Sequence, residues 1–584
     1  MLKLFKNLHK KDYIFILVSF ILIIMQVWLE LKMPDYMSKV TVLVQSDGSR
    51  MSEILLNGLY MILCAFGSLI STIIVGYLVA SVSASFSFNT RKKLFNKIED
   101  LSMSDVKKFK VSSLITRTTN DITQIEMLIA MGLQLLIKAP VTAIWAVTKI
   151  LNKNYTWSIA TLIAVMVLLV VIVILTVIVM PKFKIIQKLT DRLNNVTREN
   201  LNGIKVVRAF NAESFQEEKF DEVNDNLTKR QLFNQRVFSV MQPVMFLTMH
   251  TLTLSIYFIG AILIKDSILS GKITLFGDMV VFSSYAIQVI MSFLMLAMIF
   301  MMMPRAAVSV RRINEVLLTD MTIKDGIKKK GKEKGTVEFK NVSFKYPDAD
   351  EYLLENISFK ANKGEVVAFI GSTGSGKSTL INLIPRFYDA TDGEVLVDGI
   401  NVKDYKLESL YNILGYVPQK AVLFDGSVNF NVLYGNNVKK NRNEIIKRAI
   451  EVAQAKDFVE KLDKQYNSHI ASKGTNISGG QKQRISIARA IARDPEIYIF
   501  DDSFSALDYK TDSQLRKALK KYTKDATTLI VAQRIGTIMN ADKIIVLNNG
   551  KCVGEGTHKE LLKTCEIYKQ IANSQLSKEE LENE

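Results

Sequence analysis

The sequence predicts two kinds of domain in one chain: an all-α membrane domain with six spanning helices, then an α/β domain with a phosphate-binding P-loop. Residues 13–303 carry long apolar runs with few charges, whereas residues 336–575 have the mixed composition of a soluble α/β domain. The soluble part contains a glycine-rich segment, 371–379, between an apolar strand and a helix start. At 584 residues the chain is too long for a single core, so we expect about two to four domains.

The formal charge of +18 and the three cysteines indicate which partners and which kinds of site to expect. No stretch alternates aromatic and basic residues as a nucleic-acid surface does, so we expect no nucleic-acid partner. Basic cytoplasmic segments of a membrane protein and a basic linker explain the charge more simply. Cys64, Cys552 and Cys565 lack the spacing of a disulfide or metal site and are expected to be reduced and buried.

The apolar runs are long enough for six membrane-spanning helices. A helix needs about 20 apolar residues to cross a hydrocarbon core of about 30 Å. Lys138 and Lys149 interrupt the third run, and in a short span both ammonium groups could reach opposite interfaces. The predicted spans lie near residues 13–31, 55–81, 138–153, 157–181, 241–264 and 276–303.

The first apolar run follows a basic segment, as in a signal peptide, but it is longer and has no small-residue cleavage site after it. We therefore expect a retained helix, and six spans then place both termini on one side. Lysines are frequent near the N-terminus and within 91–110, whereas the predicted outer segments 46–53 and 152–155 are weakly charged. This bias predicts a multi-pass protein of the cell (plasma) membrane with both termini in the cytoplasm.

Two long connections, about 55 and about 60 residues, separate spans two from three and four from five. Both are predicted to be helical hairpins that extend the spans, because about 25 helical residues project about 37 Å. We expect the tips near 116–122 and 209–215. Phe210 and Phe215 at the second tip suit docking in a groove of another domain, or packing on their own hairpin.

The sixth span is rich in methionine and reaches Pro304, which is expected to end or kink the helix. Four methionines recur at helical spacing: Met291, Met295, Met298 and Met302. Such a face suits an adaptable apolar cavity, although packing in the core or against lipid explains it equally well. The predicted regions are a membrane domain at 1–318, a basic linker at 319–335, an ATP-binding domain at 336–576 and an acidic tail at 577–584.

The segment between the strand at 365–370 and the helix start at 380–384 has the P-loop pattern. Its backbone N–H groups point into one small space, where the helix dipole and Lys377 add positive charge. Such a loop binds phosphate, and the Ser378 hydroxyl is placed to hold Mg²⁺. The predicted nucleotide-binding residues are Gly371, Ser372, Thr373, Gly374, Ser375, Gly376, Lys377, Ser378 and Thr379.

Further polar residues follow predicted strands of the same domain. Gln419 ends the strand at 415–419 and can reach a metal-bound water, and Asp501 ends the buried strand at 497–501, where it can hold Mg²⁺ through water. Tyr346, shortly before the P-loop, can stack on an adenine ring, although an exposed turn tyrosine is more often incidental. Asp502 directly follows Asp501, and Gln533 follows the predicted strand at 528–532. These two residues and Asp508 are also expected at the nucleotide site.

A second anion-binding helix start lies about 100 residues after the P-loop, ahead of the helix at 482–492. It consists of Ser478, Gly479, Gly480 and Gln481. The two helix starts cannot obviously share one site within a chain. The second is therefore expected to serve another subunit.

Together these motifs closely resemble the nucleotide-binding domain of an ABC transporter, and the six-span domain with two long hairpins resembles that of an ABC exporter half-transporter. The resemblance covers nearly the whole chain, with Ile477 in place of the usual Leu of the signature segment. It implies ATP and Mg²⁺ as cofactors and a head-to-tail dimer. Each ATP would lie between one subunit's P-loop and the other's signature segment, and its binding and hydrolysis would switch the membrane domains between inward- and outward-facing states.

Three departures from the family pattern concern the ATP site. Asp502 stands where the family has a Glu as general base, which sets the carboxylate back by about 1.5 Å, and such misplacement can cost about 10²-fold. Gln533 replaces the switch His and carries no positive charge. Ala471 and Ser472 replace a Gly-Glu pair, so an acidic contact to the hairpins is expected to be missing. The predicted catalytic residues are Asp502, Gln533 and Gln419.

These departures predict that this chain binds ATP at its own P-loop, hydrolyses it slowly, and lends an intact signature segment to a competent site on a partner. We therefore expect one half of a heterodimeric exporter that moves amphipathic drug-like or lipid compounds across the lipid bilayer. A homodimeric lipid flippase and an ATP-gated regulatory or channel-like subunit are the alternatives, the latter disfavoured because long regulatory insertions are missing. The abundance of Lys, Ile and Asn indicates an AT-rich bacterial genome.

Overall fold

The structure, a computed structural model, describes residues 8–46, 50–151, 155–265, 269–436 and 440–576. The chain folds as two compact units: Met1–Ile98 with Ser112–Leu318, and Glu99–Val111 with Thr319–Glu584. The expected acidic tail at 577–584, most of the connection at 152–155 and the lysines before residue 8 lie outside the described residues. The second unit is therefore discontinuous in sequence and includes a short piece of the predicted first hairpin.

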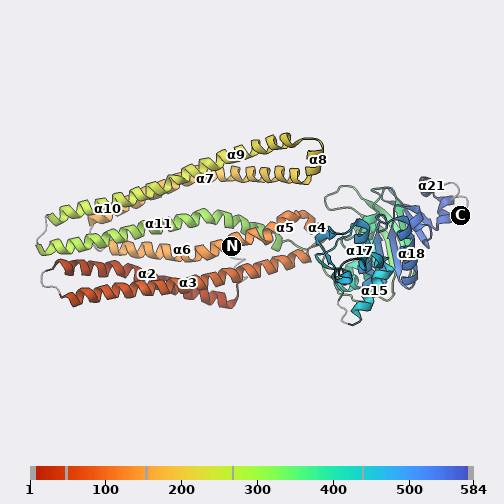
Figure 1. Cartoon of the computed structure of the whole chain (residues 1–584), viewed down its shortest axis with the longest axis horizontal. Helices are drawn as coiled ribbons and strands as arrows, with labels where there is room; N and C mark the ends of the chain where they lie inside the picture. Colours follow the sequence, from red (N-terminus) through yellow and green to blue (C-terminus); the bar gives the residue numbers. More distant parts are fainter. Residues whose placement is uncertain (1–7, 47–49, 152–154, 266–268, 437–439, 577–584) are drawn as a thin grey trace. The chain divides into compact units, whose positions relative to one another are not determined.

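Long helices build the first unit (Figure 1). In the described part of the chain, six helical segments are long and apolar enough to cross a membrane, which confirms the predicted all-α six-helix membrane domain. The helices run well past the predicted spans, as the hairpin expectation requires. Their bounds are α2 Lys10–Gln45, α3 Met51–Asp100, α5 Val111–Thr118, α6 Asn120–Leu151, α7 Tyr155–Asn202, α8 Ile204–Ala209, α9 Glu213–Ser239, α10 Met241–Lys265 and α11 Leu269–Leu317.

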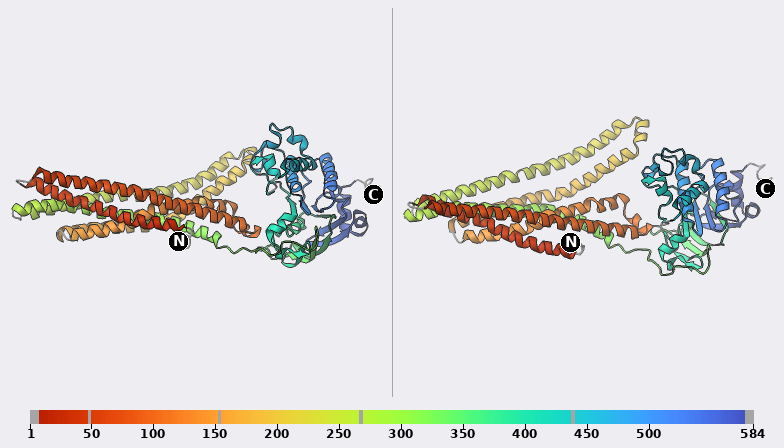
Figure 2. Two further views of the ribbon diagram at one scale, coloured as in Figure 1. Left: turned by 90° about the horizontal axis from the view of Figure 1, so that it is seen from below. Right: turned by 60° about the horizontal axis from the view of Figure 1, so that its bottom comes forward.

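The second hairpin is formed by α7 and α9, which run side by side to the short helix α8 (Figure 1 and the right-hand view of Figure 2). Its turn falls close to the predicted tip, and Phe210 and Phe215 are exposed there. The predicted position of the first tip, 116–122, is wrong, because that segment covers the junction of α5 and α6. The tip is instead the short helix α4, Met103–Lys108, which begins where the Ser102 side chain accepts a hydrogen bond from Asp105 N.

Two further features of the membrane domain concern Pro304 and two lysines. Of the two outcomes expected at Pro304, an end of the helix is wrong, since α11 continues to Leu317, and a kink stays a prediction. Lys138 and Lys149 both pair with carboxylates of α2, and that they reach opposite interfaces stays a prediction. Within its own helix, neither lysine has an obvious partner in the sequence. The packing of α2 against α6 supplies a carboxylate for each.

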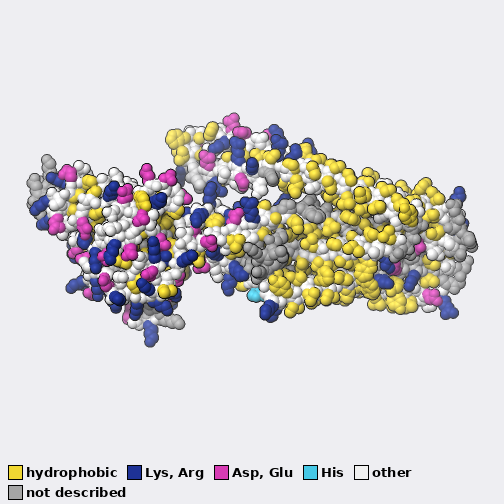
Figure 3. All heavy atoms as spheres, turned by 180° about the vertical axis from the view of Figure 1, so that it is seen from behind, with side chains coloured by type: hydrophobic (Ala, Val, Ile, Leu, Met, Phe, Trp, Pro, Cys, Tyr) yellow, Lys and Arg dark blue, Asp and Glu magenta, His cyan; other side chains and the backbone are white. Residues whose placement is uncertain are grey.

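The two units differ in surface chemistry (Figure 3). Hydrophobic side chains dominate the visible face of the helical unit, whereas basic and acidic side chains mix over the other unit. Ile21, Ile73 and Val173 are more than half exposed on three different helices, as expected of a lipid-facing surface. Met291 and Met298 of the methionine face are also exposed, at 42% and 47%, so neither side chain is enclosed in the core of this chain.

The described residues of the second unit form three β-sheets. The largest has six strands in the order β12-β11-β3-β10-β9-β6, parallel except for β12, and an antiparallel sheet has the order β2-β1-β4-β5. β7 and β8 form the third. The bounds are β1 Val337–Phe344, β2 Leu354–Ala361, β3 Val366–Gly371, β4 Asp392–Val397, β5 Ile400–Asn401, β6 Leu414–Val417, β7 Gly426–Ser427, β8 His469–Ile470, β9 Ile497–Asp501, β10 Thr527–Val531, β11 Lys543–Asn548 and β12 Lys551–Gly556.

Helices and the smaller sheet cover the two faces of this central sheet. One core joins its inner side chains to α12 and the antiparallel sheet, and the other joins them to α15 and α17. The helices are α12 Lys377–Asn382, α13 Leu407–Ile413, α14 Val428–Val432, α15 Arg442–Val452, α16 Lys456–Val459, α17 Gly479–Arg493, α18 Tyr509–Tyr522, α19 Ile535–Ile538, α20 His558–Thr564 and α21 Glu566–Asn573. Parallel β3, β10 and β9 are adjacent, so the polar residues that follow them meet at one edge.

Candidate nucleotide-binding site

The predicted P-loop lies between the central strand β3 and helix α12. Gly376 caps α12 in the left-handed region with φ 92°, which glycine adopts without strain. A Cβ atom at this position would lie 2.6 Å from Leu354 Cδ2, so packing also requires glycine. The loop therefore turns as the motif predicts and brings the start of α12 to the carboxyl end of the sheet.

The ammonium group of Lys377 lies within the loop that precedes it. Lys377 Nζ donates hydrogen bonds to the backbone oxygens of Gly371 and Ser372, at 2.9 and 2.7 Å, and lies 3.3 Å from Ser375 Oγ. Burial lowers the pKa of Lys377, and the charges of Asp502 and Asp501 oppose that shift. The cation is thus preorganised at the loop, where its present partners are weak carbonyl acceptors that an anion can replace.

Ser378 and Asp501, both predicted as metal ligands, are brought together. Ser378 Oγ donates a hydrogen bond of 2.7 Å to Asp501 Oδ1. Asp501 is only 4% exposed, and burial raises its pKa, with the nearby charge of Asp502 adding to that effect. A hydroxyl and a carboxylate side by side are oxygen donors of the kind that Mg²⁺ prefers.

Asp502, Gln419 and Gln533 also converge, although they come from three different strands. Asp502 Oδ2 accepts hydrogen bonds from Gln533 Nε2 at 2.9 Å and from Gln419 Nε2 at 3.4 Å. Burial raises the pKa of Asp502, and hydrogen bonds with Gln419 and Ser505 oppose that shift. One carboxylate oxygen is therefore occupied by two neutral amides of the same chain.

Tyr346 lies beside the P-loop helix. Its hydroxyl oxygen is 3.0 Å from Thr379 Oγ1, and its ring meets the ring of Tyr388 edge-on with centroids 5.3 Å apart. Lys107 of α4 places Nζ 5.1 Å from the Tyr346 centroid and 5.4 Å from that of Tyr388. A hydrogen bond with Tyr388 is the main reason that the pKa of Lys107 is raised. A basic residue from the first hairpin therefore contacts the predicted adenine-stacking tyrosine.

Sequence reasoning missed this contact and the hydrogen bonds that position it. Asp105 Oδ1 accepts a hydrogen bond of 2.6 Å from the Thr322 hydroxyl, and Oδ2 accepts one of 3.0 Å from Thr322 N. Burial alone would raise the pKa of Asp105, but these bonds outweigh it and hold the pKa below its usual range. The sequence Ser102-Met-Ser-Asp105 was the available signal, because Ser followed three residues later by an acidic residue is typical of a helix start.

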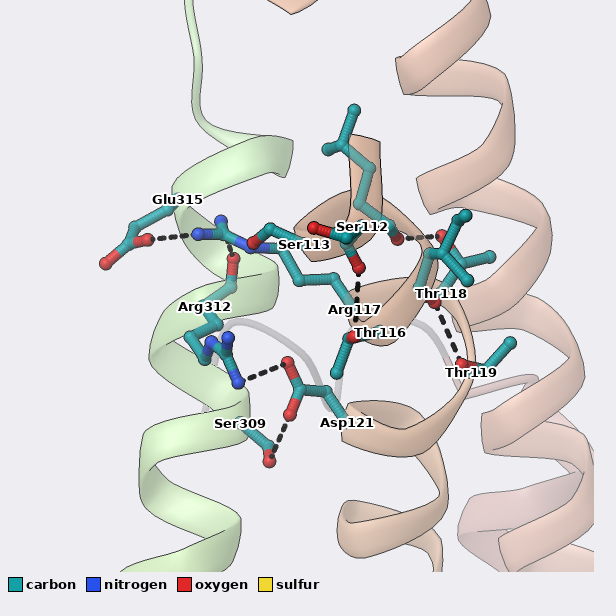
Figure 4. Close-up of polar contacts among 12 residues, drawn as sticks. Ser112, Ser113, Thr116, Arg117, Thr118, Thr119, Asp121, Ser309, Arg312 and Glu315 are labelled. Atoms are coloured by element: carbon teal, nitrogen blue, oxygen red, sulfur yellow. Dashed lines mark hydrogen bonds and ion pairs between the residues drawn. The ribbon is translucent and has the colours of Figure 1, made fainter. Parts of the chain in front are cut away.

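The first hairpin is also joined to the last helix of the membrane domain (Figure 4). Arg117 pairs with Glu315 at 3.0 Å and donates to the backbone oxygen of Arg312 at 2.6 Å. Asp121 accepts a 2.9 Å hydrogen bond from Ser309 and lies 3.5 Å from the Arg312 guanidinium. α5 and α6 are thus fixed to the end of α11 by side chains that the sequence did not pair.

The signature segment is exposed and structurally separate from this cluster. Ser478 caps α17: its hydroxyl accepts from Gln481 N at 3.3 Å, and Gln481 Oε1 accepts from Ser478 N at 2.9 Å. A Cβ atom on Gly480 would lie 3.2 Å from the backbone oxygen of Ala506, so the chain two residues before Asp508 runs beside the signature. Asp508 Oδ2 accepts a hydrogen bond from Thr511 N and caps α18. Over the described ranges, no hydrogen bond joins Ser478–Gln481 to the P-loop.

Comparison with known proteins identifies the class of protein. The family described as ABC transporter transmembrane region matches residues 14–293, and the family described as ABC transporter matches residues 354–505. An uncharacterized ABC transporter ATP-binding protein of Mycobacterium tuberculosis is 37% identical over 524 residues, 88% of this chain and 87% of the relative. The ABC transporter ATP-binding protein YfiB of Bacillus subtilis is 35% identical over 566 residues, 96% of each chain. The chain therefore belongs to the ABC transporters.

Two further likenesses concern exporters. The ATP-dependent lipid A-core flippase of Pseudomonas aeruginosa is 31% identical over 504 residues, 86% of this chain and 82% of the relative. The solved structure of a bacterial Atm1-family ABC exporter with ATP bound has a TM-score of 0.82 at 23% identity, over 96% of this chain and 98% of that one. The fold is thus that of an ABC exporter, with a transmembrane domain followed by an ATP-binding domain, and this architecture implies ATPase-coupled transport.

Proposed function

We propose that this chain is one half of a heterodimeric exporter that uses ATP to move amphipathic compounds outward across the plasma membrane. The observation that carries the proposal is the position of Asp502, a short carboxylate already bonded to Gln419 and Gln533 where the family has a free general base. The chain's own P-loop site then binds ATP and hydrolyses it slowly. The signature segment completes a second, faster site on a partner.

At the chain's own site, the P-loop N–H groups and Lys377 bind the phosphates of ATP. Phosphate oxygens replace the loop carbonyls that now accept from Lys377 Nζ, because an anion is the stronger acceptor. Ser378, Asp501 and Gln419 would hold Mg²⁺, which would offset the negative charge of the phosphates. Tyr346 stacks on the adenine ring.

Slow hydrolysis follows from the surroundings of Asp502. A general base must lie within hydrogen-bond reach of the attacking water, and the aspartate side chain is one methylene shorter than glutamate. Two amide donors also stabilise the carboxylate form and occupy Oδ2. Gln533 can orient a water or phosphate oxygen but cannot neutralise charge that develops in the transition state.

The signature segment supports the partner side of the proposal. Ser478 and Gly479 are exposed, and a Cβ atom on Gly479 would meet no atom within 4 Å. The N-terminus of α17 is therefore open to an anion brought by another subunit. A head-to-tail pairing of two ATP-binding domains would fill it.

A homodimeric lipid flippase is the second candidate, and the likeness to the lipid A-core flippase of Pseudomonas aeruginosa favours it. In that arrangement both ATP sites carry Asp502, and the pair turns over slowly. The two candidates share an amphipathic substrate, to which the exposed methionines Met291 and Met298 present an adaptable apolar surface.

ATPase measurements separate the candidates. The full-length chain is purified alone and together with a second half-transporter of the same genome that carries the Glu and His this chain lacks, each in the same lipid mixture. We expect poor hydrolysis alone and a steep rise in the mixed complex. Robust turnover by the chain alone, unchanged by the second subunit, would overturn the heterodimer.

A further inference from the structure

Two ion pairs join α2 to α6 inside the membrane domain, and one of them is complete. Asp35 Oδ2 pairs with Lys149 Nζ at 2.7 Å, and Asp35 Oδ1 accepts a 2.6 Å hydrogen bond from the Tyr285 hydroxyl. Both carboxylate oxygens therefore have a partner within the fold. Such a pair needs no ligand and fixes three helices to one another.

The other pair is incomplete. Glu30 Oε1 accepts from Lys138 Nζ at 2.9 Å, from Gln26 Nε2 at 2.9 Å and from Ser68 Oγ at 3.2 Å, while none of the bonds recorded among described residues goes to Oε2. Gln26 is 2% exposed, yet its Oε1 has no hydrogen-bond partner within the described part of the chain. The same holds for Oγ1 of Thr142, which is 7% exposed and one turn from Lys138. Unpartnered buried acceptors are costly, so this cluster has unused capacity to bind a donor.

The incomplete pair lies deep in the membrane domain. The predicted spans 13–31 and 138–153 put Glu30 and Lys138 at span ends, but α2 continues 15 residues beyond Glu30 and α6 begins 18 residues before Lys138. Both residues therefore lie well inside long helices, and Glu30 accepts a hydrogen bond from Ser68, the middle residue of the predicted span 55–81. The side chains of Lys138 and Glu30 are nevertheless 17% and 25% exposed. Charges at this depth do not face lipid cheaply, so the exposed part is expected to face a polar path through the protein.

We propose that Gln26, Glu30, Lys138 and Thr142 bind the headgroup of the transported amphiphile, and that this headgroup is a zwitterion with a primary ammonium beside a phosphate. The ammonium donates to Glu30 Oε2 and Gln26 Oε1, and the phosphate accepts from Lys138 and Thr142. A bound zwitterion leaves the net charge of the cluster unchanged, whereas a singly charged headgroup would change it. A quaternary ammonium has no N–H to give to Gln26. This inference rests on the proposed export of amphiphiles and names their headgroup.

The test is a binding measurement that does not involve ATP. The full-length chain in maltoside detergent is titrated with dioctanoyl phosphatidylethanolamine, phosphatidylcholine and phosphatidylglycerol, and with glycerophosphoethanolamine, which lacks acyl chains. Fluorescence of Trp28 and Trp145, close in sequence to the cluster on α2 and α6, reports binding. We expect the ethanolamine lipid to bind about tenfold more tightly than the choline lipid, since one charge-assisted donor is lost. The acyl-free headgroup is expected to bind far more weakly.

Matched variants locate the site. Glu30→Gln with Lys138→Met removes the incomplete pair without leaving a lone charge and should abolish the preference. Asp35→Asn with Lys149→Met removes the complete pair and should leave the preference for the ethanolamine lipid unchanged. Gln26→Leu leaves both ion pairs intact and should reduce the preference for the ethanolamine lipid. This single variant tests the site even if the double variants do not fold.

Equal binding of the ethanolamine and choline lipids, tighter binding of the glycerol lipid, or an unchanged preference in Gln26→Leu would each overturn the inference. Acyl-free headgroup binding as tight as that of the lipid would assign the site to a soluble compound instead. The ATPase comparison of the chain with and without its partner is independent of these titrations. A failed headgroup preference beside the expected ATPase behaviour therefore rejects only the headgroup site.

Discussion

The ATP-binding domain carries two anion-binding helix starts whose surroundings differ. At the P-loop, Lys377 and Ser378 already have partners within the domain, and the carboxylates they approach are buried. At the signature, Ser478 and Gln481 cap their own helix, while Ser478 and Gly479 lie exposed. The first helix start has polar partners within its own domain, and under the proposal the second is half of a site that another subunit completes.

This difference shows how binding and catalysis can be divided between two chains. Under the proposal, the P-loop retains nucleotide even when its general base is short, because retention depends on the loop, the lysine and the metal ligands. An exposed signature contributes only when another subunit supplies the nucleotide. Under the proposed division, damage to the signature should cost far more turnover than damage to Asp502.

The largest effect is expected from Gly479→Asp. The position has room for a side chain, so the fold should persist while a carboxylate enters the place of the partner's phosphate. Repulsion between the two anions should lower ATPase activity of the assembled transporter by about 100-fold. Gly479→Ala adds a Cβ without charge and should lose much less. Full activity in Gly479→Asp would show that this segment serves no competent site.

A gain is expected when the chain's own site is restored. Asp502→Glu with Gln533→His returns the longer carboxylate and a group able to carry positive charge, so ATPase activity of the isolated chain should rise by about tenfold. The single-turnover rate is the measurement. Asp502→Asn with Gln533→His is the matched control and should remain slow. No increase in the first variant would mean that slow turnover has another cause.

Nucleotide affinity offers a smaller effect. Tyr346→Leu removes the aromatic face next to Thr379 and should weaken ATP binding by about fivefold. Equilibrium binding of ATP to the full-length Tyr346→Leu variant is measured beside Tyr352→Leu, which alters an exposed tyrosine of the same loop. Equal affinities of the two variants would remove Tyr346 from the site.

The smallest effect is expected from Asp502→Ala in the assembled transporter. Because the proposal places the faster site under the signature segment, turnover should fall by less than about twofold. Steady-state ATPase activity of the complex is the readout, with Lys377→Ala as a comparison that also removes nucleotide binding. A loss as large as that of Gly479→Asp would mean that both sites hydrolyse ATP at similar rates.

Local sequence patterns predicted the elements that position the site. The P-loop follows β3, Asp501 ends β9, and Gln533 follows β10, because each motif is a strand–turn unit readable within a few residues. Pairings across the chain could not be read in this way. Glu30 and Lys138 are 108 positions apart, and Asp35 and Lys149 are 114 apart, so only helix packing reveals them. Lys107 was missed for the same reason, since the first hairpin tip was expected a dozen residues too late.

The short helix α4 has a practical consequence for experiments on the isolated ATP-binding domain. The compact unit that contains this domain borrows Glu99–Val111 from the middle of the membrane half. A fragment that begins at residue 319 loses Asp105, the acceptor for Thr322, and Lys107, the cation over Tyr346. In such a fragment the ring of Tyr346 lacks the cation that lies over it in the intact chain. Nucleotide affinities measured on such a fragment therefore describe a different surface from that of the whole transporter subunit.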